Sequence, residues 1–137
     1  MSVELFYEDV EIPGLDPEFF VSWFEKVTLE EEKVLGDITI VFCSDDYLLD
    51  VNRRHLDHDY YTDIITFDYS EWPVVSGDLF VSSDRVADNA KGLEIEFKEE
   101  LDRVVVHGLL HLCGYKDKSD EEELVMREKE DYYLGKR

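Results

Sequence analysis

The chain has 137 residues, of which 44% are hydrophobic, and its 35 acidic and 14 basic side chains give a formal net charge of −21. This length suits one domain with its own core, and we expect a single domain over residues 1–137. The charge argues against a nucleic-acid substrate, because lysine and arginine supply most of the sequence-independent affinity for phosphates.

The first half of the chain predicts a strand, a helix, a strand and a second helix. Residues 3–10 alternate imperfectly between apolar and charged side chains, which indicates an early strand. Asp16 as N-cap and Pro17 at the first helical position mark a helix start. The apolar stripe of that helix consists of Phe19, Phe20, Trp23, Phe24 and Val27. An apolar, β-branched run at residues 38–43 predicts a central strand, and Ser44 caps a helix that reaches about residue 55.

Two further strands are predicted at residues 62–68 and 78–83, and we expect them to pair antiparallel around a loop at residues 70–77. The loop contains Trp72. An exposed tryptophan there can stack on a nucleic-acid base, although it can equally cover the core.

The last part of the chain predicts three helices. Ser83 or Asp84 caps a helix that Gly92 ends, and a longer helix covers residues 97–113. Ser119 caps a final helix that extends to about Leu134. The acidic residues of its first turn complement the helix dipole, so we interpret them as a solvated helix start.

The helix over residues 97–113 carries the strongest signal in the chain. His107 and His111 are four residues apart and therefore lie on one helix face, where both imidazoles can reach one ion. Gly114 suits a helix C-cap, and the reversal there can deliver Asp117. Two histidines and a carboxylate with a fourth position open to water are typical of a catalytic zinc site.

An alternative is that ordinary hydrogen bonds satisfy the two histidines. The neighbouring side chains are strongly apolar, so unpaired imidazoles would be costly to bury there, and a bound ion removes that cost. His55 and His58 do not have a spacing that joins this motif. Cys113 lies about 200° around the helix from His111. We therefore assign Cys113 and the isolated Cys43 to core packing, in agreement with a reducing compartment.

Gly108 separates this motif from that of zinc proteases, in which a glutamate follows the first histidine as general base. Glycine takes no proton, and in a helix it costs about 1 kcal/mol relative to alanine. We therefore expect a substrate or another backbone to approach closely at Gly108.

The string His-Gly-Leu-Leu-His-Leu-Cys-Gly-Tyr at residues 107–115, followed by Asp117, closely resembles the signature of the YbeY family of bacterial metal-dependent endoribonucleases. A second block agrees, with Asn52, Asp59 and residues 62–67. Residues 77–79 resemble the family's next strand. Met126 and Glu130 fit its closing helix.

The resemblance implies an α+β fold in which a mixed sheet of about four strands packs with about five helices and the metal-binding helix is central. It implies one Zn2+ ion held by His107, His111 and Asp117. It also implies a hydrolase that cleaves RNA phosphodiester bonds in ribosomal RNA maturation and ribosome biogenesis. The partner would be ribosomal RNA rather than DNA, with the ribosome or a ribosomal protein. Catalytic residues beyond the ligands are not identified.

Two positions depart from the family pattern. Asp117 stands where most members carry a third histidine, which adds a negative charge and lowers the Lewis acidity of a bound ion. Leu56 stands where the family usually has an arginine. Arg53 or Arg54 can replace that arginine, although both also suit a solvated helix surface.

Local charge relieves part of the overall repulsion of RNA. Residues 98–137 hold eight of the 14 basic side chains, and Lys116 and Lys118 flank Asp117. Fields are screened beyond about 8–10 Å at physiological salt. We therefore expect weak RNA binding that needs the ribosome or a protein partner.

Other functions and the location of the protein also follow as expectations. A metal-dependent peptidase or amidase and a non-enzymatic ribosome-associated factor with a structural metal remain alternatives. No apolar run reaches about 18 residues and no basic, apolar leader occurs. We therefore expect no contact with a membrane and a cytoplasmic protein.

Overall fold

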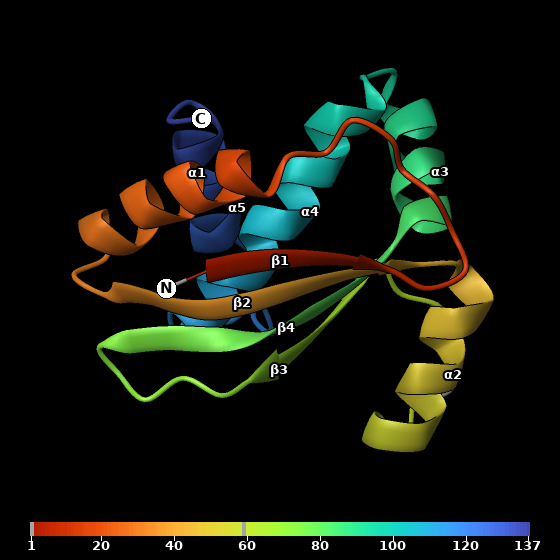
Figure 1. The fold of residues 1–137 in the computed structure, drawn as a ribbon, viewed down its shortest axis with the longest axis horizontal. Helices are drawn as coiled ribbons and strands as arrows, with labels where there is room; N and C mark the ends of the chain where they lie inside the picture. Colours follow the sequence, from red (N-terminus) through yellow and green to blue (C-terminus); the bar gives the residue numbers. More distant parts are fainter. Residues whose placement is uncertain (1, 59) are drawn as a thin grey trace.

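The computed structural model describes residues 2–58 and 60–137, and these form four strands and five helices (Figure 1). The elements in chain order are β1 (Ser2–Tyr7), α1 (Pro17–Glu30), β2 (Val34–Cys43), α2 (Asp45–Leu56), β3 (Ile64–Asp68), β4 (Val74–Ser82), α3 (Ser83–Leu93), α4 (Phe97–Leu112) and α5 (Asp120–Leu134). The predicted α+β class is confirmed.

The four strands form one mixed sheet in the order β1-β2-β4-β3. β1 pairs parallel with β2, and β2 pairs parallel with β4. β3 pairs antiparallel with β4, so that Thr66 lies opposite Leu79. The predicted antiparallel pair is therefore confirmed, and the mixed character of the sheet comes from β3 alone.

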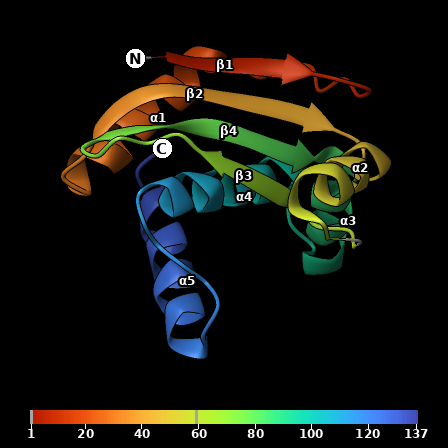
Figure 2. The ribbon, with the colours of Figure 1, turned by 90° about the horizontal axis from the view of Figure 1, so that it is seen from below.

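The helices lie unevenly around this sheet. Figures 1 and 2 show α1, α4 and α5 on one side of it, whereas α2 follows β2 near the strand ends on the opposite side. The main core fills the space between the sheet and α1, α4 and α5, and a smaller cluster around Leu48 and Ile65 lies beneath α2. None of the helices in residues 2–58 and 60–137 is long and apolar enough to cross a bilayer.

Helix α4 is the central helix, as predicted. It contacts β3, β4, α3 and α5. Ten of its residues are buried, namely Glu100, Leu101, Asp102, Val104, Val105, Val106, Gly108, Leu109, Leu110 and Leu112. Cys43 and Cys113 are buried free thiols, and burial raises the pKa of each to about 12, which agrees with a packing role.

Three of the predicted helix starts, those of α1, α2 and α5, are confirmed by side-chain caps. The Asp16 carboxylate accepts a hydrogen bond from the Glu18 amide (3.0 Å), and Ser44 Oγ accepts one from the Tyr47 amide (3.1 Å). Ser119 and Glu122 form a reciprocal capping box at the start of α5.

Several boundaries differ from those predicted. The strands predicted at residues 3–10, 38–43 and 62–68 are β1, which ends at Tyr7, β2, which begins at Val34, and β3, which begins at Ile64. Ser82, rather than Ser83 or Asp84, caps α3. That helix continues through Gly92 and ends where Glu94 takes a left-handed conformation with φ of 56°. β4 begins at Val74, so the predicted loop at residues 70–77 is shorter.

Candidate metal centre

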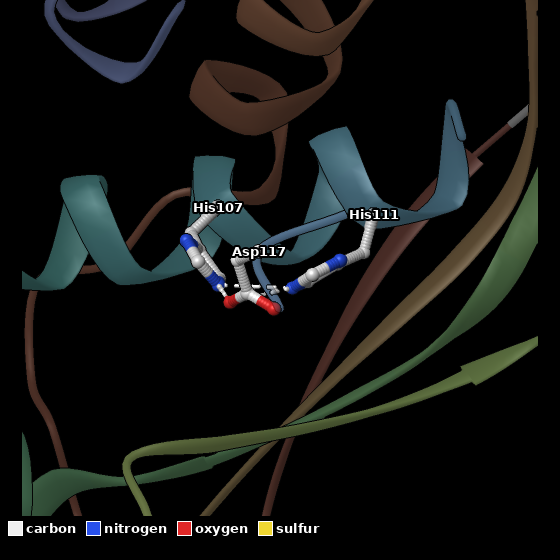
Figure 3. Close-up of side chains that lie close together, drawn as sticks. All are labelled: His107, His111 and Asp117. Carbon is white, nitrogen blue, oxygen red and sulfur yellow. Dashed lines mark hydrogen bonds and ion pairs between the residues drawn. The ribbon is translucent and has the colours of Figure 1, made fainter. Parts of the chain in front are cut away.

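His107, His111 and Asp117 converge on one point beside α4 (Figure 3). The two Nε2 atoms are 3.0 Å apart. Asp117 Oδ2 lies 3.1 Å from His107 Nε2 and 3.4 Å from His111 Nε2. All three side chains are partly accessible to solvent. We call these three residues the triad.

The triad turns three hydrogen-bond acceptors toward one another. His107 Nδ1 lies 2.6 Å from the Glu130 carboxylate, and His111 Nδ1 lies 2.9 Å from the Tyr115 carbonyl oxygen. Both partners only accept, so each Nδ1 donates its proton, and in the corresponding neutral tautomer Nε2 presents a lone pair. Two lone pairs and a carboxylate at this spacing repel one another, and a cation between them removes that repulsion.

The spacing within the triad also suits a metal ion. Bonds of about 2.0–2.1 Å from tetrahedral zinc to nitrogen and oxygen separate neighbouring ligand atoms by roughly 3.3 Å. The observed separations of 3.0, 3.1 and 3.4 Å lie around that value. The triad residues therefore fit a divalent ion with one coordination position left open.

The turn after α4 brings Asp117 to the histidines. Gly114 has φ of 110°, a conformation that glycine adopts without a Cβ penalty. The Tyr115 amide donates to the Leu110 carbonyl (3.0 Å), which closes the turn, and the Tyr115 hydroxyl donates to the Glu31 carboxylate (2.7 Å). The Tyr133 hydroxyl also donates to Glu31. The turn is thereby fastened to both α1 and α5.

Glu130 on α5 holds His107. Its side chain is only 7% exposed, and Arg103 Nη1 donates to its second oxygen at 2.9 Å. Burial alone would raise the pKa of Glu130, but the hydrogen bonds and charges of His107 and Arg103 outweigh burial and lower it. Burial correspondingly opposes protonation of His107, whereas Glu130 and Asp117 raise its pKa above the usual value.

A cavity of about 390 Å³ adjoins the triad on the side of His107. We call it the His107-side cavity. It is lined by Asp63, Glu100, Arg103, Val104, His107, Asp117, Glu123, Met126, Arg127 and Glu130. Burial raises the pKa of Asp63 and of Glu100, and Glu100 Oε1 is buried without a hydrogen-bond partner among the described residues. These two carboxyls can therefore hold a proton at higher pH than ordinary carboxyls.

A second cavity of about 390 Å³ adjoins His111, and we call it the His111-side cavity. It is lined by Thr66, Asp68, Trp72, His111, Leu112, Gly114, Tyr115 and Lys116. Its charged groups are fewer than those of the His107-side cavity. The triad thus lies between an acid-rich cavity and a more apolar one.

Gly108 faces the sheet and not the solvent. It is buried, and a Cβ built on it would lie 2.7 Å from Ile64 Cδ1 and 3.0 Å from Leu79 Cδ2. The close approach expected at this glycine is therefore made by core side chains of β3 and β4. The expectation of a substrate or a backbone there was wrong.

Residues 9–137 match the family model described as Endoribonuclease YbeY. The chain belongs to the YbeY family. A Flavobacterium psychrophilum protein named Endoribonuclease YbeY is 50% identical over 84% of this chain and 82% of its own. A Bacteroides thetaiotaomicron protein of the same name is 44% identical over the full length of both chains. A Thermotoga maritima protein solved in solution matches 96% of this chain and 86% of its own with a TM-score of 0.66 and 26% identity.

The second block of the YbeY resemblance includes a structural residue. Asn52 is buried, and its side-chain Nδ2 donates to the Tyr60 backbone carbonyl (2.9 Å). The backbone carbonyl of Asn52 accepts a hydrogen bond from the His58 amide (3.2 Å). Asn52 therefore holds the connection between α2 and β3. Asp59, from the same block, lies outside the described residues.

The residues weighed as replacements for the YbeY arginine lie on α2. Leu56 is the last residue of that helix, and Arg54 pairs with Asp50 at 3.0 Å. Neither Arg53 nor Arg54 occurs among the described residues that line the two cavities beside the triad. His55 and His58 also lie apart from the triad, in contact with Phe67 and Tyr60 respectively.

Sequence reasoning missed the roles of Glu130 and Arg103. A signal existed, because Met126, Glu130 and Tyr133 are the buried residues of α5 and have helical spacing. An acid on that apolar face requires a buried partner. The sequence did not indicate that the partners lie on α4.

Proposed function

We propose that this protein is a metal-dependent endoribonuclease that acts in ribosomal RNA maturation and ribosome biogenesis. Membership of the YbeY family supports RNA as the substrate. The observation that carries the proposal is the convergence of three acceptor atoms from His107, His111 and Asp117 between two cavities that can receive a substrate.

We propose a single zinc ion as the cofactor, held by the triad. Two imidazoles and one carboxylate are a typical donor set of catalytic zinc, and such an ion supplies Lewis acidity to a phosphoryl oxygen when bound. The protein residues prepare the site. Glu130 and the Tyr115 carbonyl fix the tautomers and the ring planes of His107 and His111.

We propose that the whole chain acts as one domain in the cytoplasm and that the ribosome or a ribosomal protein supplies part of the RNA affinity. The formal charge of −21 opposes unaided binding of a polyanion. Two buried free thiols support a reducing compartment.

The peptidase alternative is not favoured. Its general base would occupy position 108, but Gly108 is packed against Ile64 and Leu79 of the sheet. A side chain there would point into the core and away from the triad. The position therefore could not present a glutamate to a peptide bond without repacking β3 and β4.

Metal analysis tests the ligand set. Purified wild-type protein should contain about one zinc per chain, whereas His107→Ala and Asp117→Ala proteins should lose most of it. Lys118→Ala, which also lies beside Asp117 but outside the triad, serves as the control and should retain the metal. Equal metal content in all four proteins would contradict the site.

Cleavage of structured ribosomal RNA tests the activity. Wild-type protein should cut it, and His111→Ala or a chelator should abolish cutting. If chelation lowers the melting temperature but leaves RNA processing intact, the metal only stabilises the fold and the nuclease proposal is wrong.

A further inference from the structure

We propose that the His111-side cavity is a nucleotide-binding subsite in which Trp72 stacks on a base of the single-stranded RNA that crosses the metal centre. This inference rests on the proposed function and specifies the side from which the substrate reaches the triad. Trp72 and His111 line the same cavity, so a base on Trp72 places a neighbouring phosphate within reach of the triad.

Trp72 is both exposed and fixed in position. Its side chain is 58% exposed, although a ring of this size is ordinarily well buried. Its Nε1 donates to the Leu112 carbonyl at 3.1 Å, and a Cβ built on Gly114 would lie 2.9 Å from its Cη2. The ring is therefore held at the C-terminal end of α4. A stacking surface that is ordered before binding loses little conformational entropy when a base binds.

Cations accompany the ring. Lys33 Nζ lies 4.9 Å from the centroid of the Trp72 ring, and Lys116 lines the same cavity. Each ammonium can move on its flexible stem to a phosphate while the base takes the ring surface. This pairing of an aromatic surface with nearby cations is the arrangement that binds single-stranded nucleic acid without sequence preference.

The charges that line the two cavities indicate from which side of the triad the RNA approaches. The His107-side cavity is lined by five acidic side chains, namely Asp63, Glu100, Asp117, Glu123 and Glu130. Its arginines are fewer than its acids: Arg103 pairs with Glu130 at 2.9 Å, and Arg127, whose side chain is 60% exposed, lies 3.6 Å from the same carboxylate. A polyanion is therefore repelled from that side. Asp68 is the one carboxylate among the described residues lining the His111-side cavity.

The chain provides its own probe for this subsite, because it contains only two tryptophans. Trp23 is 1% exposed, and its Nε1 donates to the Tyr133 carbonyl at 2.8 Å within the main core. A ligand added to the folded protein can therefore reach Trp72 but not Trp23. A change in tryptophan emission on binding reports contact with Trp72.

The test uses the metal-loaded full chain and a fluorescein-labelled 2′-O-methyl pentaadenylate, whose integrity is checked by chromatography. Unlabelled probe should quench the emission of wild-type protein and leave that of Trp72→Leu unchanged. Anisotropy should show an affinity about tenfold lower for Trp72→Leu, the loss of one stacked base, with partial recovery in Trp72→Phe. Inorganic tripolyphosphate, which has no base, should bind wild-type protein and Trp72→Leu equally.

Tyr69→Leu is the matched control, because Tyr69 is 61% exposed but lines a cavity beside α2. It should bind the probe like wild-type protein. Melting curves and metal content show whether Trp72→Leu keeps its fold and its metal. If Trp72→Leu loses its fold or its metal, the test rests on the tryptophan emission of wild-type protein. The absence of quenching by the unlabelled probe then overturns the proposal.

Unchanged affinity in a folded, metal-loaded Trp72→Leu protein also overturns the subsite, even if that protein cleaves RNA normally. If wild-type protein cleaves no RNA but quenching and the affinity difference persist, the subsite stands and the nuclease proposal fails.

Discussion

His107 and His111 are held by groups that no local motif would pair with them. Glu130 lies 23 residues beyond His107 in the chain and approaches it only because α5 packs against α4. The partner of His111 is the backbone carbonyl of Tyr115, so no particular side chain at that position marks it.

Glu130→Gln tests whether this contact tunes the metal site. Glutamine keeps the volume but loses the charge and turns an amide donor or a weaker acceptor toward Nδ1 of His107. We expect zinc affinity, measured by competition with a chelator, to fall by about 10–100-fold. Asp131→Asn removes the other carboxylate partner of Arg103 without touching His107 and should leave the affinity unchanged. Equal losses in both variants would assign the effect to Arg103.

Glu31 should contribute stability that disappears in acid. Burial raises its pKa, but hydrogen bonds from Tyr133 and Tyr115 and the charge of Lys129 outweigh burial, so the folded-state pKa lies below the ordinary value of 4.5. A lowered pKa stabilises the fold above the unfolded-state pKa, and the stabilisation is lost as pH falls through the folded-state value.

Glu31→Gln should therefore lower the free energy of unfolding by about 2 kcal/mol at pH 7, the contribution of hydrogen bonds to a charged group. Urea unfolding should show this difference narrowing below about pH 4.5. Glu25→Gln, at an exposed position of α1, should match wild-type protein throughout. A difference independent of pH would show that the Glu31 charge is not responsible.

At the residue scale, the three residues of the triad were predicted from the sequence, but the groups that hold His107 and His111 in place were not. Spacing on a helix fixes the relation of His107 to His111, and Gly114 predicts the reversal toward Asp117. These are local rules, and the structure brings the three side chains together accordingly. Metal binding by the triad remains a prediction.

At the scale of elements, helix boundaries were predicted where a residue type marks them. Asp16, Ser44 and Ser119 each cap a helix, because the side chain accepts a hydrogen bond from a backbone amide of the first turn. These residue types are the preferred N-caps, so the sequence indicates these helix starts. The end of α3 could not be predicted from the sequence, because Glu94 adopts the left-handed conformation while Gly92 remains helical. Glutamate gives no advance signal of that conformation.

Gly77 should be irreplaceable in β4. A Cβ there would lie 2.4 Å from the Phe67 carbonyl oxygen on β3 and 2.9 Å from Leu112 Cδ2 on α4. The first contact is with backbone, so relief requires β3 to move. We expect Gly77→Ala to destabilise the protein by about 1–3 kcal/mol in chemical unfolding.

Gly92→Ala is the control for that substitution. A Cβ at Gly92 would meet nothing within 4 Å, and the residue is helical and exposed. Alanine is favoured over glycine in a helix by up to about 1 kcal/mol, so this variant should be slightly more stable than wild-type protein. A loss of stability in Gly92→Ala would show that α3 is strained at that position.

At the scale of the whole molecule, the strand order could not be predicted from periodicity. Runs of apolar residues predicted strands, but the placement of β4 between β2 and β3 depends on how the helical connections cross the sheet. The class and the central helix followed from the family resemblance. The opposite placement of α1 and α2 became visible only in three dimensions (Figure 1).

The net charge predicts a protein that salt stabilises. With 35 acidic and 14 basic side chains, self-repulsion opposes the compact state, and added ions screen it. We expect the melting temperature at pH 7 to rise as sodium chloride increases from roughly 0.02 to 0.3 M, over which the Debye length shortens several-fold. The rise should shrink near the sequence pI of about 4.3, where the net charge vanishes. A melting temperature that falls with salt would show that specific ion pairs outweigh the repulsion.

Tyr115 joins two distant parts of the chain through one residue. Its carbonyl accepts from His111, and its hydroxyl donates to Glu31, which lies 84 residues earlier beside the end of α1. A ligand that binds only the folded triad stabilises whatever must be ordered for the triad to exist. The last turn of α1 is one of the segments that must be ordered for the triad to form. Amide hydrogen exchange in that turn should therefore slow when the triad binds a metal ion. In this sense the first helix is part of the metal site although it supplies no ligand.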